Sequence, residues 1–471
     1  METYDVIVIG AGAVGENAAV IPAQHGLRVA IVESHLVGGE CSYWACIPSK
    51  TLLNPGRILS YARSNPATRS LVDGRLDPEA VFRRRDVMTS NWDDSSQVRW
   101  IEDNGIDLIR GHGRLAGERL VEVTDETGKA TTYRASRAVI VATGSDPSSP
   151  GIEGLEDVDT WTSRELTSAS HVPRRMAIVG GGAVGVEMAQ AWAWLGSEVT
   201  LVHNSAHLLP SEEPFAGEEL ARALEESGVR VITEARTNRV QRSGNGAILE
   251  IEVGESTIQV IVDEVAVATG RRPRTKDLGV EAVGLSPGEH LQVDDHMRVE
   301  GVAGGWLYAV GDVNGRALLT HYGKYQARIA GAHASGVESA AVDPISAIPR
   351  VIFTNPEVAA VGLTEKQATD SGIDVAVVTH DIGNIAAAGT LGEGYAGTVK
   401  LVIDRHQDVV VGATFVGPEV AELLHSATVA IVGRVPLTRL WHAVPAFPTF
   451  SEVWLRLLER YRDSGWDPYS G

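Results

Sequence analysis

Cysteine is scarce in this sequence: only Cys41 and Cys46 occur among 471 residues, with four residues between them. So few cysteines exclude a secreted domain held together by disulfides, and a lone close pair indicates redox chemistry or a metal site instead. Positive charge is also in deficit, with 41 Lys and Arg against 61 Asp and Glu and a formal net charge of −20. We therefore expect no nucleic acid and no anionic membrane surface as a partner.

Long apolar runs are missing as well, and none approaches the roughly 20 residues that a membrane-spanning helix needs. The first residues, METYDVIVIGAGAVG, lack the basic segment, apolar stretch and cleavage site of a secretory leader, so we expect a cytoplasmic protein. Glycine, by contrast, is abundant: the 50 glycines and a hydrophobic fraction of 44% fit an α/β protein rich in tight turns. The length suffices for about three domains.

One pattern occurs twice in the chain. DVIVIGAGAVGENAA at residues 5–19 is repeated as MAIVGGGAVGVEMAQ at residues 176–190, each an apolar run followed by G-x-G-x-x-G. In a dinucleotide-binding unit such glycines let the backbone approach a pyrophosphate at a helix N-terminus. One motif of this kind also occurs at ordinary strand-to-helix corners, whereas two favour a pair of nucleotide sites. The predicted pyrophosphate-binding glycines are Gly10, Gly12, Gly15, Gly180, Gly182 and Gly185.

The end of the next strand distinguishes the two predicted sites. Glu33 lies 23 residues after Gly10, where an acidic residue binds the adenosine ribose hydroxyls. At the same distance from Gly180 the residue is His203, so the second site lacks that acid. Because a carboxylate there would repel a 2′-phosphate, its absence favours NADPH over NADH, although no Arg or Lys follows between His203 and Pro210. The alternative is that His203 is a solvent-facing strand end.

The two cysteines lie in VGGECSYWACIPSKTLL, residues 37–53. On a regular helix, residues i and i+5 are about 7.5 Å apart along the axis. This exceeds the roughly 4.4–6.8 Å between α-carbons that a disulfide tolerates. We therefore expect Cys41 in a loop or distorted turn and Cys46 at the start of a helix, with Pro48 in its first turn. A helix N-terminus would favour the thiolate of Cys46.

Together these motifs resemble the pyridine nucleotide–disulfide oxidoreductases of the dihydrolipoamide dehydrogenase, glutathione reductase and mercuric reductase type. The resemblance spans essentially the whole chain and adds GGxCxxxxCxPSK, ATG turns, YAxGD and FTxPEVAxVGLTE to the two glycine motifs. It implies a homodimer with an α/β fold of two dinucleotide-binding (Rossmann-like) domains and a C-terminal α+β dimerisation domain. The expected segments are 1–150 (FAD-binding, first part), 151–270 (NAD(P)H-binding), 271–346 (FAD-binding, second part) and 347–471 (dimerisation).

The resemblance also implies an electron relay, in which NAD(P)H reduces FAD and FAD reduces a Cys41–Cys46 disulfide. In this relay Cys46 lies next to the flavin and Cys41 exchanges with substrate. Lys50 lies beside the flavin and pairs with Glu187, each favouring the charged form of the other; a surface charge is the alternative for Glu187. The expected cofactor-binding residues are Gly10, Gly12, Gly15, Glu33, Gly39, Lys50, Gly113, Thr143, Gly144, Asp312 and Thr320 for FAD, and Gly180, Gly182, Gly185, Glu187, His203 and Gly270 for the nicotinamide nucleotide. No bound metal is expected.

The sequence departs from this family near its C-terminal end. Disulfide reductases of the family have a His-Pro-Thr segment followed by Ser-Glu, and this histidine moves a proton in the partner subunit's site. The matching stretch, AVPAFPTFSEVW at 443–454, has Phe447 in place of the histidine and keeps the catalytic candidate Glu452. Because a phenyl ring carries no proton, disulfide exchange would lose roughly 10²–10⁴-fold in rate. His442, five residues upstream, is an alternative base.

We therefore predict an FAD-dependent NAD(P)H oxidoreductase that passes electrons through the flavin and the Cys41–Cys46 pair to a small-molecule acceptor. An acceptor that needs no proton from a histidine, such as a quinone, a metal ion or another small oxidant, fits best. One alternative is a dihydrolipoamide dehydrogenase-like enzyme or low-molecular-weight disulfide reductase with an unidentified base. The other is a non-catalytic FAD-binding protein.

Overall fold

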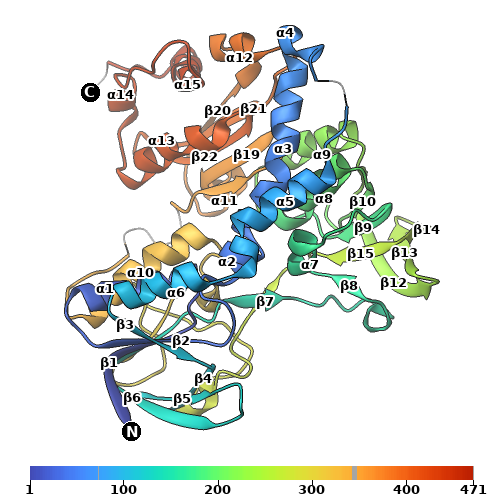
Figure 1. The fold of residues 1–471 in the computed structure, drawn as a ribbon. Helices are drawn as coiled ribbons and strands as arrows, with labels where there is room; N and C mark the ends of the chain where they lie inside the picture. The colour runs from blue at the N-terminus through green and yellow to red at the C-terminus, as the bar shows by residue number, and fades with distance from the viewer. Residues whose placement is uncertain (73, 342–346, 470–471) are drawn as a thin grey trace. The chain divides into compact units, whose positions relative to one another are not determined.

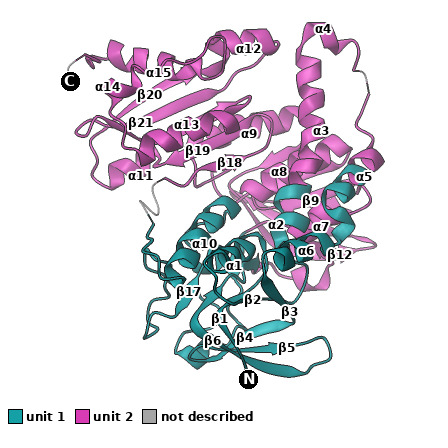
Figure 2. Cartoon of the chain, turned by 60° about the vertical axis from the view of Figure 1, so that its left-hand side comes forward, with its two compact units in different colours: residues 1–48, 83–148, 270–344 teal, residues 49–82, 149–269, 345–471 magenta. Residues whose placement is uncertain are grey.

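The chain forms two compact units in the computed structural model, which describes residues 1–72, 74–341 and 347–469 (Figures 1 and 2). Each unit collects three separate segments of chain. Unit 1 consists of residues 1–48, 83–148 and 270–344, and unit 2 consists of residues 49–82, 149–269 and 345–471. Helices α3 (Cys46–Ser64) and α5 (Pro78–Met88) continue from one unit into the other.

Unit 1 is built on a seven-stranded sheet in the order β3-β2-β1-β6-β5-β4, with β17 paired to β6. The sheet is parallel from β3 through β2 and β1 to β6, and β17 is also parallel to β6. Strand β5 pairs antiparallel with β6, and β4 pairs antiparallel with β5. A short antiparallel ladder joins β7 to β16. The strands are β1 (Glu2–Ile9), β2 (Val29–Glu33), β3 (Ile106–Arg110), β4 (His112–Gly117), β5 (Leu120–Thr124), β6 (Ala130–Val141), β7 (Ser145–Pro147), β16 (Arg271–Pro273) and β17 (Leu307–Ala309).

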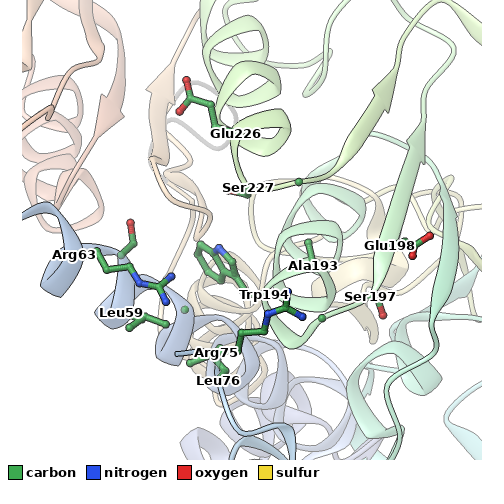
Figure 3. A pocket seen from close by; sticks show the side chains of 14 residues that line it. Leu59, Arg63, Arg75, Leu76, Ala193, Trp194, Ser197, Glu198, Glu226 and Ser227 are labelled. Carbon is green, nitrogen blue, oxygen red and sulfur yellow. The ribbon is translucent and has the colours of Figure 1, made fainter. Parts of the chain in front are cut away.

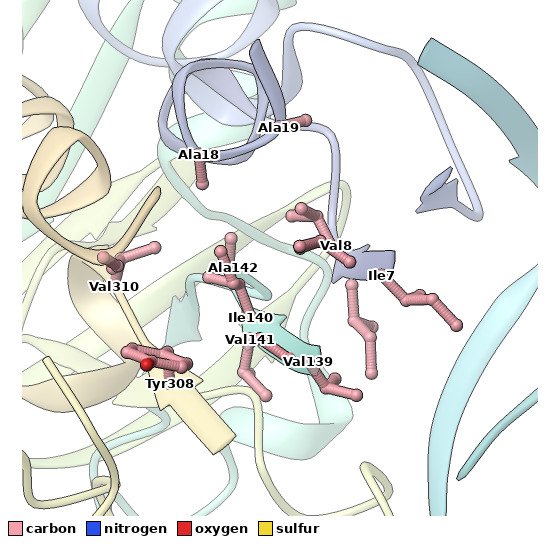
Figure 4. Packing of buried hydrophobic residues seen from close by; sticks show 14 of the residues in the cluster. Ile7, Val8, Ala18, Ala19, Val139, Ile140, Val141, Ala142, Tyr308 and Val310 are labelled. Carbon is pink, nitrogen blue, oxygen red and sulfur yellow. The ribbon is translucent and has the colours of Figure 1, made fainter. Parts of the chain in front are cut away.

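The core of unit 1 lies between this sheet and its helices. Buried Ile7 and Val8 of β1 and Ile140 of β6 pack with Ala18 and Ala19 of α1, whose small side chains let the helix lie close to the sheet (Figure 4). Parallel strands are apolar along their length because helices cover both faces of the sheet. The helices are α1 (Ala13–Gln24), α2 (Gly39–Tyr43), α6 (Ser95–Asp103) and α10 (Thr320–Ala334), with 3₁₀ turns η1 (Ser90–Trp92), η3 (Val280–Val283) and η4 (Gly311–Asn314).

Unit 2 contains a parallel five-stranded sheet, β11-β10-β9-β15-β8, and two antiparallel sheets, β12-β13-β14 and β18-β19-β22-β21-β20. The strands are β8 (Thr160–Trp161), β9 (Arg175–Val179), β10 (Glu198–Val202), β11 (Arg230–Ile232), β12 (Ala235–Ser243), β13 (Gly246–Val253), β14 (Ser256–Val262), β15 (Glu264–Val267), β18 (Arg350–Ile352), β19 (Glu357–Gly362), β20 (Val375–Asp381), β21 (Thr398–Asp404) and β22 (Val409–Gly417). The helices are α4 (Pro66–Arg69), α7 (Ser163–Ser168), α8 (Ala183–Leu195), α9 (Pro214–Glu226), α11 (Glu365–Asp370), α12 (Ala386–Leu391), α13 (Val420–Val432), α14 (Leu437–Leu440) and α15 (Glu452–Asp463), with 3₁₀ turns η2 (Leu155–Asp157) and η5 (Ile382–Asn384).

The predicted α/β fold class is confirmed, and both sequence repeats form the expected strand, glycine turn and helix. In unit 1 the repeat is β1 followed by α1, and in unit 2 it is β9 followed by α8. The division into four functional segments stays a prediction, and its boundary at residue 346 lies outside the described residues. None of the described helices combines the length and the apolar composition that crossing a membrane requires.

Gly56 of α3 provides a test of packing in unit 2. A β-carbon at this position would lie 1.9 Å from Cε3 of Trp194, so Gly56→Ala must displace the indole ring. We expect a loss of about 1–3 kcal/mol, seen as a lower midpoint of thermal unfolding. The matched control is Gly389→Ala in α12, where nothing lies within 4 Å of the added carbon. Because alanine favours helix by about 0.5–1 kcal/mol over glycine, the control should be neutral or stabilising; equal effects of both variants would contradict this packing.

Candidate functional site

The first glycine turn approaches neighbouring backbone so closely that side chains are excluded. A β-carbon at Gly10, where φ is +102°, would lie 2.5 Å from the carbonyl oxygen of Ala142. A β-carbon at Gly15 would lie 1.9 Å from the carbonyl oxygen of Gly10. Helix α1 begins after Gly12 with no side-chain cap, which leaves its first N–H groups for a ligand. These features fit the pyrophosphate of FAD.

The backbone orients Glu33 at the end of β2. Its Oε2 accepts a hydrogen bond from the N–H of Ala11 at 2.7 Å, and its Oε1 accepts one from the N–H of His35 at 2.8 Å. Each carboxylate oxygen keeps a further lone pair for a ribose hydroxyl. Gly39, the first residue of α2, lies against the same turn, since a β-carbon there would be 2.8 Å from Cα of Gly12. The first turn, Glu33 and Gly39 thus lie together in unit 1.

Four other predicted FAD contacts also belong to unit 1. These residues are Gly113 in β4, Thr143 and Gly144 after β6, and Asp312 in η4. Asp312 Oδ2 accepts a hydrogen bond from Ser145 Oγ at 2.6 Å, and Thr143 Oγ1 donates to the carbonyl of Arg274 at 3.0 Å. Asp312 therefore points toward the segment that follows β6, as a contact to the same ligand requires.

The two cysteines are free thiols, and both lie in helices. Cys46 begins α3, as predicted. Cys41 lies within the five-residue helix α2, so the expectation of a loop or distorted turn is wrong. The break that brings the two residues together occurs after α2, where Trp44 has φ −138° and leaves helical geometry. The two cysteines can therefore lie close together because they belong to two separate helices, which one continuous helix would not allow.

Thr320, the first residue of α10, lies beside this pair. Its Oγ1 is 3.4 Å from Sγ of Cys46, so the hydroxyl can donate a hydrogen bond to a thiolate there. The hydrogen bond with Cys46 and burial both raise the pKa of Cys41, while Thr320 and Lys324 act in the opposite direction. The net effect is a raised pKa of Cys41, which favours the protonated thiol at this position.

Lys50 and Glu187 form an ion pair within unit 2. Lys50 Nζ lies 2.7 Å from Glu187 Oε2, and the Glu187 residue is 4% exposed. The other carboxylate oxygen accepts the N–H of Phe353 at 2.9 Å, and the ammonium lies 4.8 Å from the centroid of the Phe353 ring. The alternative of a surface charge for Glu187 is wrong, because this carboxylate is buried and both its oxygens are bound.

The second glycine turn repeats the geometry of the first. A β-carbon at Gly180 would lie 2.3 Å from the carbonyl oxygen of Ala268, and one at Gly185 would lie 1.8 Å from that of Gly180. Helix α8 begins after Gly182, again without a side-chain cap. His203 directly follows β10 and is 8% exposed, so the alternative of a solvent-facing residue is wrong. Gly270, predicted to contact the nicotinamide nucleotide, has φ +141° and precedes β16 in unit 1.

Glu452 is buried at the start of α15, where its carboxylate is already bound. Arg456 donates to its Oε1 from Nε at 3.1 Å and from Nη2 at 2.6 Å, and Ala386 N–H donates to Oε2 at 3.3 Å. Phe447 is 74% exposed, and His442 is also exposed. Among the described residues, no histidine hydrogen-bonds Glu452, which agrees with Phe447 standing in place of the family's histidine.

Glu16 is a site candidate that the sequence analysis missed. Its Oε1 is buried and has no hydrogen-bond partner among the described residues. Burial raises the pKa of Glu16 to about 7, Lys324 opposes this shift and Glu33 adds to it. An acidic residue in the first turn of a helix is common because the helix dipole favours it, so the sequence held no signal of this environment.

A cavity of about 500 Å³ lies in unit 2, and none of the predicted site residues lines it. Its lining includes Arg63, Arg75, Trp194, Glu198 and Glu226 (Figure 3). The mixed charges of this lining do not indicate one class of ligand. The described residues also include no cluster of three or more His, Cys, Asp or Glu side chains placed to hold a metal ion.

The fold and the two glycine turns define a protein that binds two dinucleotides. The pyridine nucleotide-disulphide oxidoreductase family matches residues 4–336, and the dimerisation domain of this family matches residues 348–457. The chain therefore belongs to the pyridine nucleotide-disulphide oxidoreductases, as predicted. Members of this family are NAD(P)H-dependent flavoprotein oxidoreductases that use FAD, which confirms the predicted enzyme class and cofactors. The dimerisation domain supports a homodimer.

Relatives match nearly the whole chain. Dihydrolipoyl dehydrogenase of Thermus scotoductus is 35% identical over 456 residues, which is 96% of each chain. Mercuric reductase of Staphylococcus aureus is 31% identical over 95% of this chain and 81% of its own. Among solved structures, the Cu(II) complex of the HOCl-induced flavoprotein disulfide reductase RclA from Escherichia coli has a TM-score of 0.85 at 25% identity, covering 98% of this chain and 100% of RclA. LpdA from Mycobacterium tuberculosis has a TM-score of 0.85 at 26% identity, with the same coverage.

The raised pKa of Glu16 predicts a pH-dependent effect of Glu16→Gln. Between pH 4.5 and about 7 the carboxyl is protonated in the folded protein but ionised in the unfolded chain, so the wild type loses stability as the pH rises through this range. The glutamine amide of the variant does not titrate. The stability of the variant relative to the wild type should therefore rise by about 3 kcal/mol across this pH range and stay constant above it. Thermal unfolding of the FAD-loaded proteins at several pH values measures it, and a difference independent of pH would contradict the shift.

Proposed function

We propose that this protein is an FAD-dependent NAD(P)H oxidoreductase that passes electrons through the Cys41–Cys46 pair to a small acceptor other than a disulfide. The observation that carries the proposal is the chemistry around Glu452. Phe447 occupies the position of the expected base, and Arg456 and the Ala386 N–H bind the carboxylate that would orient a base. A disulfide acceptor requires a proton donor for its leaving thiolate. The Phe447 ring has no proton to give, and the Glu452 carboxylate is bound by other groups.

The residues of unit 1 support the relay itself. When bound, FAD accepts a hydride from NAD(P)H and delivers two electrons to the disulfide. Glycines 10, 12 and 15 with Glu33 would hold its pyrophosphate and ribose, and Asp312 and Thr320 would lie along the rest of the cofactor. After reduction, Cys46 holds the thiolate, stabilised by the Thr320 hydroxyl and by the N-terminus of α3, while Cys41 holds the proton.

The Lys50–Glu187 pair keeps a positive charge one helical turn after Cys46. Lys50 lies four residues after Cys46 on α3, so the two side chains share a face of the helix. The buried Glu187 carboxylate offsets the cost of holding the ammonium away from water. The family resemblance implies that Lys50 would lie beside the flavin, where an ammonium favours electron density arriving on the ring.

Quinones and metal ions are the acceptors that this site fits best. Both take electrons from a dithiol without a leaving thiolate, and the phenyl ring of Phe447 offers an apolar contact to a flat molecule. The similarity to RclA, whose solved structure is a Cu(II) complex, supports a metal ion as a second acceptor class. A cytoplasmic location remains a prediction.

A dihydrolipoamide dehydrogenase-like activity is the second candidate. It is favoured by the 35% identity to dihydrolipoyl dehydrogenase of Thermus scotoductus and by the intact cysteine pair. This activity would need another base, and the exposed His442 is a candidate on the same segment as Phe447.

An acceptor panel tests the proposal. With NADH or NADPH as the reductant, kcat/KM should be roughly 10²–10⁴-fold higher for a quinone or Cu(II) than for lipoamide or glutathione disulfide. Cys41→Ser should lower turnover with the preferred acceptor, because the exchanging sulfur is removed. Disulfide turnover equal to quinone and Cu(II) turnover would contradict the proposal. If neither NADH nor NADPH bleaches the bound flavin, a non-catalytic protein is favoured.

A graft of the missing base tests the role of Arg456. Phe447→His alone should raise disulfide turnover little, because the Glu452 carboxylate stays bound to the guanidinium. The double variant Phe447→His with Arg456→Ala frees this carboxylate and should add about tenfold or more. Phe447→His with Arg460→Ala, which removes an exposed arginine from the same helix, is the matched control. If the control gains as much as the double variant, the Glu452–Arg456 pair does not block the base.

A further inference from the structure

His203 is held rigidly at the end of β10 by its own backbone and by the second glycine turn. Its N–H donates to the carbonyl of Ile232 at 2.8 Å, and its carbonyl accepts the N–H of Ala235 at 2.9 Å. The N–H of Gly181 donates to Nδ1 of the imidazole at 3.2 Å. A β-carbon at Gly181 would lie 2.6 Å from Cγ of His203, so only glycine leaves room for the ring in this position.

These contacts determine where the imidazole carries its proton. Because Nδ1 accepts a hydrogen bond, it has no proton, and a neutral ring must then carry one on Nε2. Burial lowers the pKa of His203, and His207 lowers it further, so the ring is neutral at physiological pH. Nε2 is buried and has no hydrogen-bond partner among the described residues. His203 thus presents a neutral N–H donor whose partner is missing.

The position of this donor indicates its partner. In a dinucleotide site, the residue at the end of the second strand of the unit contacts the adenosine ribose. A ribose 2′-hydroxyl can accept the Nε2–H hydrogen bond, whereas a 2′-phosphate brings close to two negative charges that a neutral ring cannot offset. No Arg or Lys lies between His203 and Pro210 to supply the positive charge.

We propose that His203 selects NADH over NADPH by donating a hydrogen bond from Nε2 to the adenosine ribose. This inference rests on the proposed function only in assigning the nicotinamide nucleotide to the turn of Gly180, Gly182 and Gly185. It reverses the preference for NADPH that the sequence favours. That preference was based on the absence of an acidic residue, whereas the structure adds that the histidine is buried and neutral.

Nucleotide binding to the FAD-loaded homodimer tests the inference directly. Calorimetric titration should give a Kd for NAD⁺ at least about tenfold lower than for NADP⁺, since the segment from His203 to Pro210 offers no Arg or Lys to a dianionic phosphate. His203→Ala should weaken NAD⁺ binding about 5- to 10-fold, the loss of one neutral hydrogen bond. His203→Arg should improve NADP⁺ binding and reverse the preference. His207→Ala, on the same loop, is the control and should leave the NAD⁺ to NADP⁺ ratio unchanged.

The outcomes separate this inference from the proposed function. If the wild type binds NADP⁺ as tightly as NAD⁺ or more tightly, or if His203→Ala leaves both affinities unchanged, the assignment of His203 is overturned even when both nucleotides reduce the flavin. If neither nucleotide binds or reduces the flavin, the proposed function fails first and the inference with it. Should His203→Ala not fold, the wild-type ratio and the response of His203→Arg still decide the question. Flavin absorbance reports folding of each variant.

Discussion

A carbonyl oxygen leaves no room for a β-carbon at the first glycine of either nucleotide turn, and the rest of this structure depends on that constraint. The oxygen belongs to Ala142 at Gly10 and to Ala268 at Gly180, in two units that have separate cores. In both turns the helix that follows begins without a side-chain cap, at the end of a parallel strand. An anion can then bind backbone N–H groups without a charged side chain. The same steric solution in both units is why one chain can hold two dinucleotides.

The three glutamates Glu187, Glu452 and Glu16 differ in the charged groups that surround them. Glu187 is buried, with its Oε2 2.7 Å from the ammonium of Lys50. Glu452 is buried against Arg456, which makes it a structural carboxylate and withdraws it from proton transfer. Glu16 has one buried carboxyl oxygen without a hydrogen-bond partner among the described residues, and burial raises its pKa to about 7. Carboxyls of the same kind thus act as counterion, as structural anchor and as a titrating group, because burial penalises the charged form unless a cation or hydrogen bonds offset it.

The repeats in the sequence predicted the strand, turn and helix of both nucleotide units, because glycine spacing and apolar runs are local signals. The start of a helix at Cys46 was also predicted from local sequence. The helix around Cys41 was not predictable, since it depends on a break after α2 that no single residue type dictates. The pairing of Glu452 with Arg456 could have been inferred from the i, i+4 spacing. The burial of His203 and the isolation of Glu16 arise from packing between distant segments, which a sequence pattern does not show.

The central claim is that a flavin and the Cys41–Cys46 pair form one electron relay. Anaerobic reductive titration of the FAD-loaded homodimer with dithionite measures how many electrons each chain accepts. The flavin and a disulfide each accept about two electrons, so the wild type should take up about four per chain and Cys46→Ser only about two. A long-wavelength absorbance band should accompany the first two electrons in the wild type, as the Cys46 thiolate comes to lie against the oxidised ring. Uptake of about two electrons by the wild type, with no such band, would contradict the relay.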